Sequence, residues 1–145
     1  MKKTLAFLCT MLLVAGSYAF NFVVNEKVLQ TFKQTFVNAE EVKWEEFKNY
    51  YSVSFVHSGI RSKVNYDKKG NMLNSTRYYS PNLLPLNVIT QLKSMYPKKE
   101  MFGVTEIVKG NLVNYYVKMH DEKHWITVKV DGSGNTELYE KYKKA

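Results

Sequence analysis

The strongest constraint on the fold is an internal repeat, because residues from about 26 to 80 carry the same pattern as residues from about 85 to 142. The matching apolar pairs, each 60 positions apart, are Val28 and Val88, Leu29 and Ile89, Phe32 and Leu92, and Phe36 and Tyr96. The matching stretches are Asn49-Tyr50-Tyr51 with Asn114-Tyr115-Tyr116, and Val64-Asn65-Tyr66-Asp67 with Val128-Lys129-Val130-Asp131. A unit of this length is too long for a solenoid repeat and too short for an independent enzyme. We therefore predict two copies of one unit that share a single sheet.

The spacing of the apolar residues predicts one helix and four strands in each copy. The first helical stripe follows Asn25 and Glu26, a capping residue and an acid in the first turn, and extends to about Val37. The second begins at Pro85 and stops at Pro97. Alternation of apolar and polar residues then predicts antiparallel strands. These strands lie near residues 41–47, 50–56, 60–67 and 72–79, and again near 104–108, 112–120, 123–131 and 136–142.

Together these patterns predict an α+β fold with one continuous antiparallel sheet. The repeated unit is one helix followed by a four-stranded β-meander. Two such units in tandem form the sheet, and both helices lie on the same face of it. The short linker Ser80–Leu84 predicts that the two halves pack together. Trp44 follows Val42 by two residues, so we expect it to cap the core beneath the first helix, with ligand stacking as the alternative.

The first 19 residues are predicted to be a secretory signal peptide and not part of the fold. Lys2 and Lys3 precede an apolar stretch over residues 5–14, and Ser17-Tyr18-Ala19 places small residues where a signal peptidase reads them. The apolar stretch is shorter than the roughly 20 residues that span a bilayer, so a membrane anchor is the less favoured alternative. We expect cleavage after residue 19, a periplasmic or secreted protein, and no stable membrane insertion afterwards.

Removal of this segment would leave 145 − 19 = 126 residues, enough for one compact domain over residues 20–145. Cys9, the only cysteine, lies in the removed segment, so the mature chain would have no thiol and no disulfide. The 21 Lys and Arg would fall to 19 against 13 Asp and Glu, a formal charge of +6. This charge fits either a solvated exported protein or one that binds an anionic partner.

Many of these positions resemble the PepSY-like, β-lactamase-inhibitor-protein-like family of exported bacterial proteins. The residues that carry the resemblance are Phe36, Ala39, Val42 and Trp44, the Tyr50–Phe55 strand, Val64–Asp67 with Gly70, and Leu84-Pro85. The resemblance covers nearly the whole mature chain. It implies a doubled unit of one helix and a four-stranded antiparallel sheet, with the helices on one face and a free concave face opposite.

The same resemblance implies a relationship to protease propeptide modules and to a secreted inhibitor of β-lactamase. That inhibitor is held together by disulfides, whereas the mature chain here would contain no cysteine. The resemblance therefore implies a shared fold and does not imply inhibition of β-lactamase itself.

The sequence offers little for catalysis, metal binding or cofactor binding. The mature chain has no Gly-x-Ser-x-Gly motif and no cysteine, and its three histidines lie at hairpin ends. His120 and His124 flank a hairpin without a suitably spaced third ligand for zinc. The loops after Asp67 and Asp131 lack the glycine and the glutamate that a calcium loop requires, so we interpret them as turns. We predict a non-enzymatic protein with no catalytic residues, no metal and no cofactor.

One face of the predicted sheet is left over once the core is assigned. Alternation directs Tyr51, Val53 and Val117 towards the helices, so the residues between them point the other way. Aromatic and basic side chains on that face form the candidate binding site: Tyr50, Arg61, Lys63, Tyr116, Lys118, Trp125 and Lys129. This mixture is typical of hot spots in protein interfaces, and a solvated outer sheet is the alternative interpretation.

The predicted function is therefore an exported protein-binding module, inhibitor-like or chaperone-like towards an envelope or secreted protein. The alternative is an electrostatic binder of an anionic polymer or lipid surface. Single-stranded nucleic acid would also suit aromatic and basic side chains, but export argues against such a partner. Salt separates the two main hypotheses, because screening weakens a charge-driven contact far more than an aromatic-anchored interface.

Overall fold

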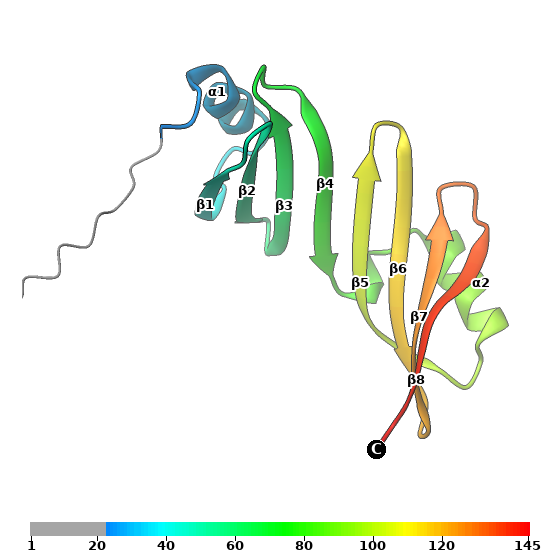
Figure 1. Ribbon diagram of the computed structural model, residues 1–145. Helices are drawn as coiled ribbons and strands as arrows, with labels where there is room; N and C mark the ends of the chain where they lie inside the picture. The colour runs from blue at the N-terminus through cyan, green and yellow to red at the C-terminus, as the bar shows by residue number, and fades with distance from the viewer. Residues whose placement is uncertain (1–22) are drawn as a thin grey trace, which may run out of the picture.

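The computed structural model describes residues 23–145, so the predicted signal peptide of residues 1–19 lies outside the described part of the chain. Each half of this part contains one α-helix followed by four strands (Figure 1). The first half comprises α1 (Glu26–Thr35), β1 (Glu40–Glu46), β2 (Tyr50–His57), β3 (Ile60–Asp67) and β4 (Met72–Tyr79). A short 3-10 helix, η1 (Pro81–Leu83), leads into α2 (Leu86–Met95), β5 (Glu100–Lys109), β6 (Leu112–His120), β7 (His124–Asp131) and β8 (Thr136–Lys143).

The eight strands form one antiparallel sheet in chain order, with β1 at one edge and β8 at the other. The predicted α+β class, with two helices and a single eight-stranded antiparallel sheet, is thereby confirmed. The largest difference concerns β5, which begins at Glu100 and not near Val104. A β-bulge at Phe102 interrupts the alternation of side chains between the faces, and this hides the start of the strand in the sequence.

Bulges occupy corresponding strands in the two halves. An extra residue lies in β1 between Glu40 and Lys43, and another lies in β5 at Phe102. The fourth strand of each half is bulged too, at Leu73 in β4 and at Tyr139 in β8. An extra residue bends its strand and increases the local twist, so these bulges help to curve the sheet.

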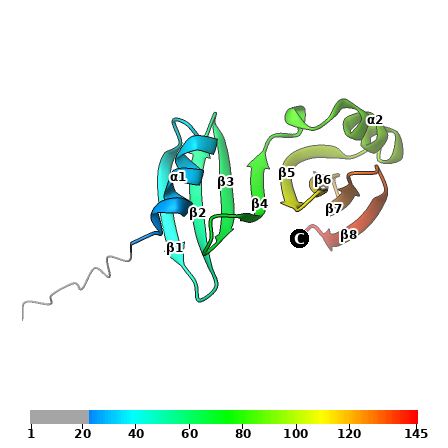
Figure 2. The ribbon, with the colours of Figure 1, turned by 90° about the horizontal axis from the view of Figure 1, so that it is seen from above.

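Each helix covers its own half of the sheet and builds a separate core (Figure 2). Helix α1 buries Val28 and Phe32, and α2 buries Val88 and Leu92 at the equivalent positions of its stripe. The first core adds Tyr51, Val53, Phe55, Val64 and Tyr66, and the second adds Leu84, Val104, Val117, Met119, Ile126, Val128 and Val130. Neither helix in residues 23–145 combines the length and apolar character that a membrane crossing requires.

Trp44 packs against the first core, as the sequence predicts. Its ring meets Phe32 edge-on with 5.3 Å between ring centroids, and it lies 6.3 Å from the ring of Tyr66. Phe32 in turn meets Phe55 edge-on at 5.0 Å. Such aromatic pairs add to the stabilisation that burial provides. The Trp44 side chain therefore serves the core beneath α1.

A polar seam joins the two cores where β4 pairs with β5. One cross-strand row through the seam reads Phe55, Ser62, Arg77, Glu106, Tyr115 and Val130. Glu106 is 6% exposed, and its carboxylate accepts hydrogen bonds from Arg77 Nε at 2.9 Å and Nη2 at 2.8 Å. The Tyr79 hydroxyl donates a third bond to Glu106 at 2.7 Å. At the seam, the ion pair of Arg77 and Glu106 takes the place of apolar packing between the halves. Both carboxylate oxygens of Glu106 accept hydrogen bonds.

The loops after β3 and β7 are built alike from an aspartate and an asparagine. Asp67 Oδ1 accepts from the backbone N–H groups of Lys69 at 2.8 Å and Asn71 at 2.9 Å, and Asn71 Nδ2 donates to Asp67 Oδ2 at 2.8 Å. Asp131 makes the same three bonds within its own loop, each at 2.9 Å. These bonds, the asparagine side-chain bond foremost, lower the pKa of both aspartates. Both carboxylates are thus occupied in forming turns.

Candidate functional site

Each of the seven residues predicted for the binding site lies on the side of its strand that faces away from the core of its own half, and we call this side the free face. One cross-strand row of the free face reads Arg61, Tyr78, Thr105, Tyr116 and Lys129. Lys63 lies in the neighbouring row, two residues along β3. Lys118 and Trp125 lie further along β6 and β7, towards the turn that joins them. The alternation of the strands therefore places these side chains on the side that the sequence predicts.

The structure does not bring all seven residues together. Tyr50 pairs with Asp67 at the far end of β2 and β3, and its ring stacks on Phe47 with 4.5 Å between centroids. Trp125 pairs with His120 and Tyr142, at the opposite end of the strands in the second half. Tyr50 and Trp125 thus occupy opposite ends of the free face. The predicted residues form a strip with an aromatic group at one end.

That aromatic group surrounds Trp125, where β5 and β7 begin and β6 and β8 end. Phe102 meets the Trp125 ring edge-on at 5.2 Å, and the His120 ring lies 4.9 Å from it. Lys144 Nζ lies 4.3 Å from the centre of the same ring. Trp125, Phe102 and Tyr142 remain 42%, 46% and 59% exposed. We call Phe102, His120, Trp125, Tyr142 and Lys144 the Trp125 cluster.

An open pocket of about 270 Å³ lies beside the Trp125 ring. Phe102, Trp125 and Tyr142 provide its aromatic lining, and Lys118 and Glu140 add one positive and one negative charge. Large aromatic side chains held on a rigid sheet lose little conformational entropy when they bind. The pocket can therefore accept a side chain of a partner that combines apolar surface with a charged or polar end.

Sequence reasoning missed several members of this region. Phe102 lies in a bulge, where alternation of side chains gives no signal. Tyr139 is also a bulge residue, and its ring meets Tyr116 edge-on at 5.0 Å. Tyr142 could have been found, because alternation along the predicted last strand directs it to the same face as Glu140. Lys144 follows the last strand, and only its contact with Trp125 places it at the site.

The basic residues of the strip are partly neutralised by neighbouring glutamates. Lys63 Nζ lies 3.5 Å from Glu45 Oε2, and Lys129 Nζ lies 3.7 Å from a carboxylate oxygen of Glu137. Arg61 and Lys118 are exposed and make no ion pair within residues 23–145. The free face therefore carries less positive charge than its lysine and arginine content suggests.

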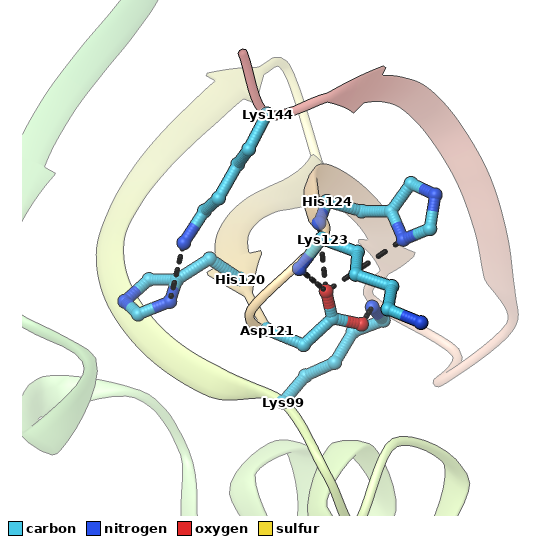
Figure 3. A network of polar contacts seen from close by, with 6 residues as sticks. All are labelled: Lys99, His120, Asp121, Lys123, His124 and Lys144. Atoms are coloured by element: carbon cyan, nitrogen blue, oxygen red, sulfur yellow. Dashed lines mark hydrogen bonds and ion pairs between the residues drawn. The ribbon is translucent and has the colours of Figure 1, made fainter.

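The turn from β6 to β7 holds a polar network next to the Trp125 cluster (Figure 3). Asp121 Oδ1 accepts from the backbone N–H groups of Lys123 at 2.8 Å and His124 at 2.7 Å. Its second oxygen pairs with the Lys99 ammonium, and this bond, followed by those from the backbone, holds the pKa of Asp121 far below its usual range. The network fixes the turn that positions the start of β7.

The two histidines at this turn face different partners. His124 Nδ1 lies 3.6 Å from Asp121, whereas His120 Nδ1 lies 3.4 Å from the Lys144 ammonium (Figure 3). Within residues 23–145, no three His, Cys, Asp or Glu side chains gather in a way that could hold a metal ion. By these contacts, His124 belongs to the polar network and His120 to the Trp125 cluster.

Glu106 is the buried carboxylate that catalysis could most readily use, and its contacts leave it no free role. Burial by itself raises the pKa of Glu106, but the bonds from Arg77 and Tyr79 outweigh this effect and lower it. A general acid or base needs a pKa near the working pH and access to substrate. Glu106 stays ionised with its oxygens bonded, so it acts as a structural group.

Comparison with known proteins shows similarity at the level of the fold. No protein-family profile matches the sequence, and no functionally curated protein matches it either. A BLIP-like protein from Bacteroides fragilis is similar over 86% of this chain and 90% of its own, with a TM-score of 0.66 and 20% identity. A protein from Bacteroides eggerthii described as a candidate periplasmic protein is similar over 84% and 90%, with a TM-score of 0.62 and 13% identity.

A DUF2874 family protein from Bacteroides uniformis is similar over 83% of this chain and 90% of its own, with a TM-score of 0.62 and 16% identity. Each likeness covers more than four fifths of this chain, but the identities are too low to carry an activity across. The PepSY-like part of the sequence resemblance stays a prediction. The chain has the α+β fold of BLIP-like proteins.

Proposed function

We propose that the protein is an exported, non-enzymatic binding module that docks a protein partner on its free face. In this proposal the two halves are tandem copies of one unit with both helices on the same side of the sheet. The cross-strand row from Phe55 to Val130 supports that arrangement, because paired residues of antiparallel strands point to one side. The helix side is occupied by the cores, and the free face is available for a partner.

The observation that carries the proposal is the exposed aromatic surface around Trp125. Phe102, Trp125, Tyr139 and Tyr142 are all more than 40% exposed, and all lie on the free face within the second half. Soluble proteins rarely expose grouped aromatic side chains without a binding role. Tyrosine and tryptophan are also the residues that most often dominate the binding free energy of protein interfaces.

The electrostatic alternative has weaker support. Binding to an anionic polymer or lipid surface requires basic side chains whose charge is available, and Lys63 and Lys129 are already paired with glutamates. We therefore favour a protein partner, an exported or envelope protein, towards which the module acts as an inhibitor or in a chaperone-like way.

Export is the part of the proposal that rests on the N-terminal sequence. The pattern of Lys2, Lys3 and the short apolar stretch is supported by the similarity to a protein described as a candidate periplasmic one. We expect the exported protein to begin at Phe20, because a signal peptidase would cut after Ala19. N-terminal sequencing of protein recovered from the periplasm or the medium tests this. An intact Met1, or a lipidated Cys9 in the membrane fraction, would contradict it.

The binding test compares Trp125→Ala with Leu86→Ala. Leu86 is 77% exposed at the start of α2, away from the free face, so its removal controls for the loss of exposed apolar surface. The partner is first isolated from the exported proteome with the wild-type protein, and affinities of the variants are then measured with that purified partner. We expect Trp125→Ala to weaken binding by at least about 2 kcal/mol and Leu86→Ala to leave it unchanged.

Salt provides the second measurement in the same experiment. An aromatic-anchored interface should keep most of its affinity between about 0.05 M and 0.5 M salt, whereas a charge-driven contact weakens steeply over that range. Undiminished binding by the Trp125→Ala variant would refute the proposed site. Binding that disappears at high salt, with no effect of the substitution, would instead favour the anionic-surface alternative.

A further inference from the structure

One contact inside the Trp125 cluster points to the chemistry that this end of the free face can bind. Lys144 Nζ lies 4.3 Å from the centre of the Trp125 ring and 3.4 Å from His120 Nδ1. The ring face attracts positive charge, and the imidazole nitrogen can accept a hydrogen bond from an N–H group. We propose that Trp125 and His120 form a binding site for an organic ammonium cation, and that Lys144 occupies this site in the free protein.

The orientation of His120 suits this role. An ammonium group only donates hydrogen bonds, so Nδ1 facing Lys144 is the unprotonated nitrogen, and the imidazole proton is assigned to Nε2. Nε2 faces Glu100 at 3.9 Å, and that carboxylate favours a proton on this nitrogen. Phe102 packs against the imidazole with 5.5 Å between ring centroids. His120 therefore presents a lone pair to the cation from a ring that is held on its other sides.

The charges around His120 add to the attraction for a cation. The groups that line the space next to it are Lys98, Glu100, Asp121, Glu122 and Lys144. Asp121 is already neutralised by Lys99, but Glu100 is exposed and has no basic side chain other than His120 within 4.0 Å in residues 23–145. With Lys144 removed, Glu100 and Glu122 leave the space beside His120 favourable for an added positive charge.

Lys144 can be replaced by an external cation because it holds the site only through its side chain. Its backbone N–H donates to the Lys123 carbonyl at 2.8 Å, so the main chain stays anchored when the ammonium moves away. The tethered ammonium competes at an effective concentration in the millimolar range or above. An exposed cation–π contact changes affinity by about 2- to 5-fold, so the site contributes selectivity at this end of a larger interface.

The consequence for recognition rests on the proposed function. A protein docked on the free face would place a lysine or arginine over Trp125 and displace Lys144. Cation binding by itself needs no partner, so the two proposals can fail separately. A site that binds a small cation while Trp125→Ala leaves partner affinity unchanged would refute the docking surface only.

The test titrates n-butylammonium, which matches the lysine side chain in length and charge, into the wild-type protein and the Lys144→Met variant. The indole N–H signal of Trp125 in NMR spectra reports binding, and that of Trp44, packed in the first core, is the internal control. We expect saturable shifts of the Trp125 signal in Lys144→Met and about 2- to 5-fold weaker binding to wild type, where Lys144 competes. Neutral 1-butanol should give no saturable shift.

Removal of the acceptor nitrogen separates a cation site from an aromatic surface that is merely apolar. The Lys144→Met/His120→Leu variant has no hydrogen-bond acceptor at position 120, so n-butylammonium should bind it several-fold more weakly than Lys144→Met. In Lys144→Met/His120→Gln the affinity should be largely retained, because the amide keeps an acceptor oxygen. Equal shifts with 1-butanol, or equal binding to Lys144→Met and Lys144→Met/His120→Leu, would overturn the proposal. Equal binding to wild type and Lys144→Met would do so as well.

Discussion

Replacing Arg77 with alanine should destabilise the folded protein by about 3 kcal/mol at neutral pH, because the Glu106 carboxylate is left buried without its cation. Breaking a buried ion pair by removing one partner costs roughly 3–5 kcal/mol. The lower end applies here, since the Arg77 side chain is 46% exposed and water can partly take its place. Urea denaturation followed by circular dichroism measures the loss.

The pH dependence of this variant identifies the cause. Burial raises the pKa of Glu106, but the bonds from Arg77 and Tyr79 lower it in the folded protein. A lowered pKa contributes stability above the unfolded value of about 4.3, and this stability is lost as the pH falls through the folded value. Without Arg77 the pKa of Glu106 should rise. The difference between variant and wild type should therefore shrink as the pH falls from about 7 to about 4.

The double variant Arg77→Ala/Glu106→Gln is the matched control for the seam. Its neutral amide needs no cation, so it should recover part of the stability that Arg77→Ala loses and show little dependence on pH over the same range. If the urea midpoint of Arg77→Ala equals that of the wild type, water compensates the Glu106 charge in the variant as well as Arg77 does in the wild type. In that case the ion pair is not what joins the two cores.

Exchanging each tryptophan for alanine should destabilise the protein by clearly different amounts. Trp44→Ala removes an aromatic ring packed on Phe32 and Tyr66, and should cost about 3 kcal/mol, the lower end of the range for buried aromatic residues because the indole is partly exposed. Trp125→Ala, on the free face, should cost less than about 1 kcal/mol. Denaturation midpoints of the two variants, measured side by side, check this. Equal losses would mean that the faces of the sheet are assigned the wrong way round.

The helices and most strands could be predicted because each leaves a periodic signal within its own residues. The stripe of Val28 and Phe32 in α1, and of Val88 and Leu92 in α2, specifies the buried side of a helix without any knowledge of the sheet. Strand alternation likewise separated inward from outward residues, which placed all seven predicted site residues on the free face. These features depend on neighbours that are close in sequence.

The polar seam could not be predicted, because it depends on residues that meet only in the folded protein. Arg77 and Glu106 are 29 positions apart, and each is a charged residue on the side of its strand that faces the cores. In the sequence of either strand alone, such a charged residue interrupts the alternation of apolar and polar residues. Only the pairing of β4 with β5 makes the two charges compensate each other.

The candidate site could be predicted only in part, and the reason for the missing part is the same. Trp125 and Tyr116 follow from alternation, whereas Phe102 lies in a bulge and Lys144 lies beyond the last predicted strand. Tyr50 shares the face but lies at its other end, because alternation determines a side of the sheet and not a position along it. Residue clusters at strand ends require the register between strands, which the sequence does not display.

The bulges in the edge strands affect how the protein behaves at high concentration. The sheet is open, so the outer backbone of β1 and of β8 is left without a neighbouring strand. A flat, regular edge would invite another molecule to add its own strand and start a growing chain of sheets. The extra residue in each edge strand breaks the even spacing of donors and acceptors that such addition needs. The fold can therefore keep a wide aromatic face uncovered and still resist polymerisation at its edges.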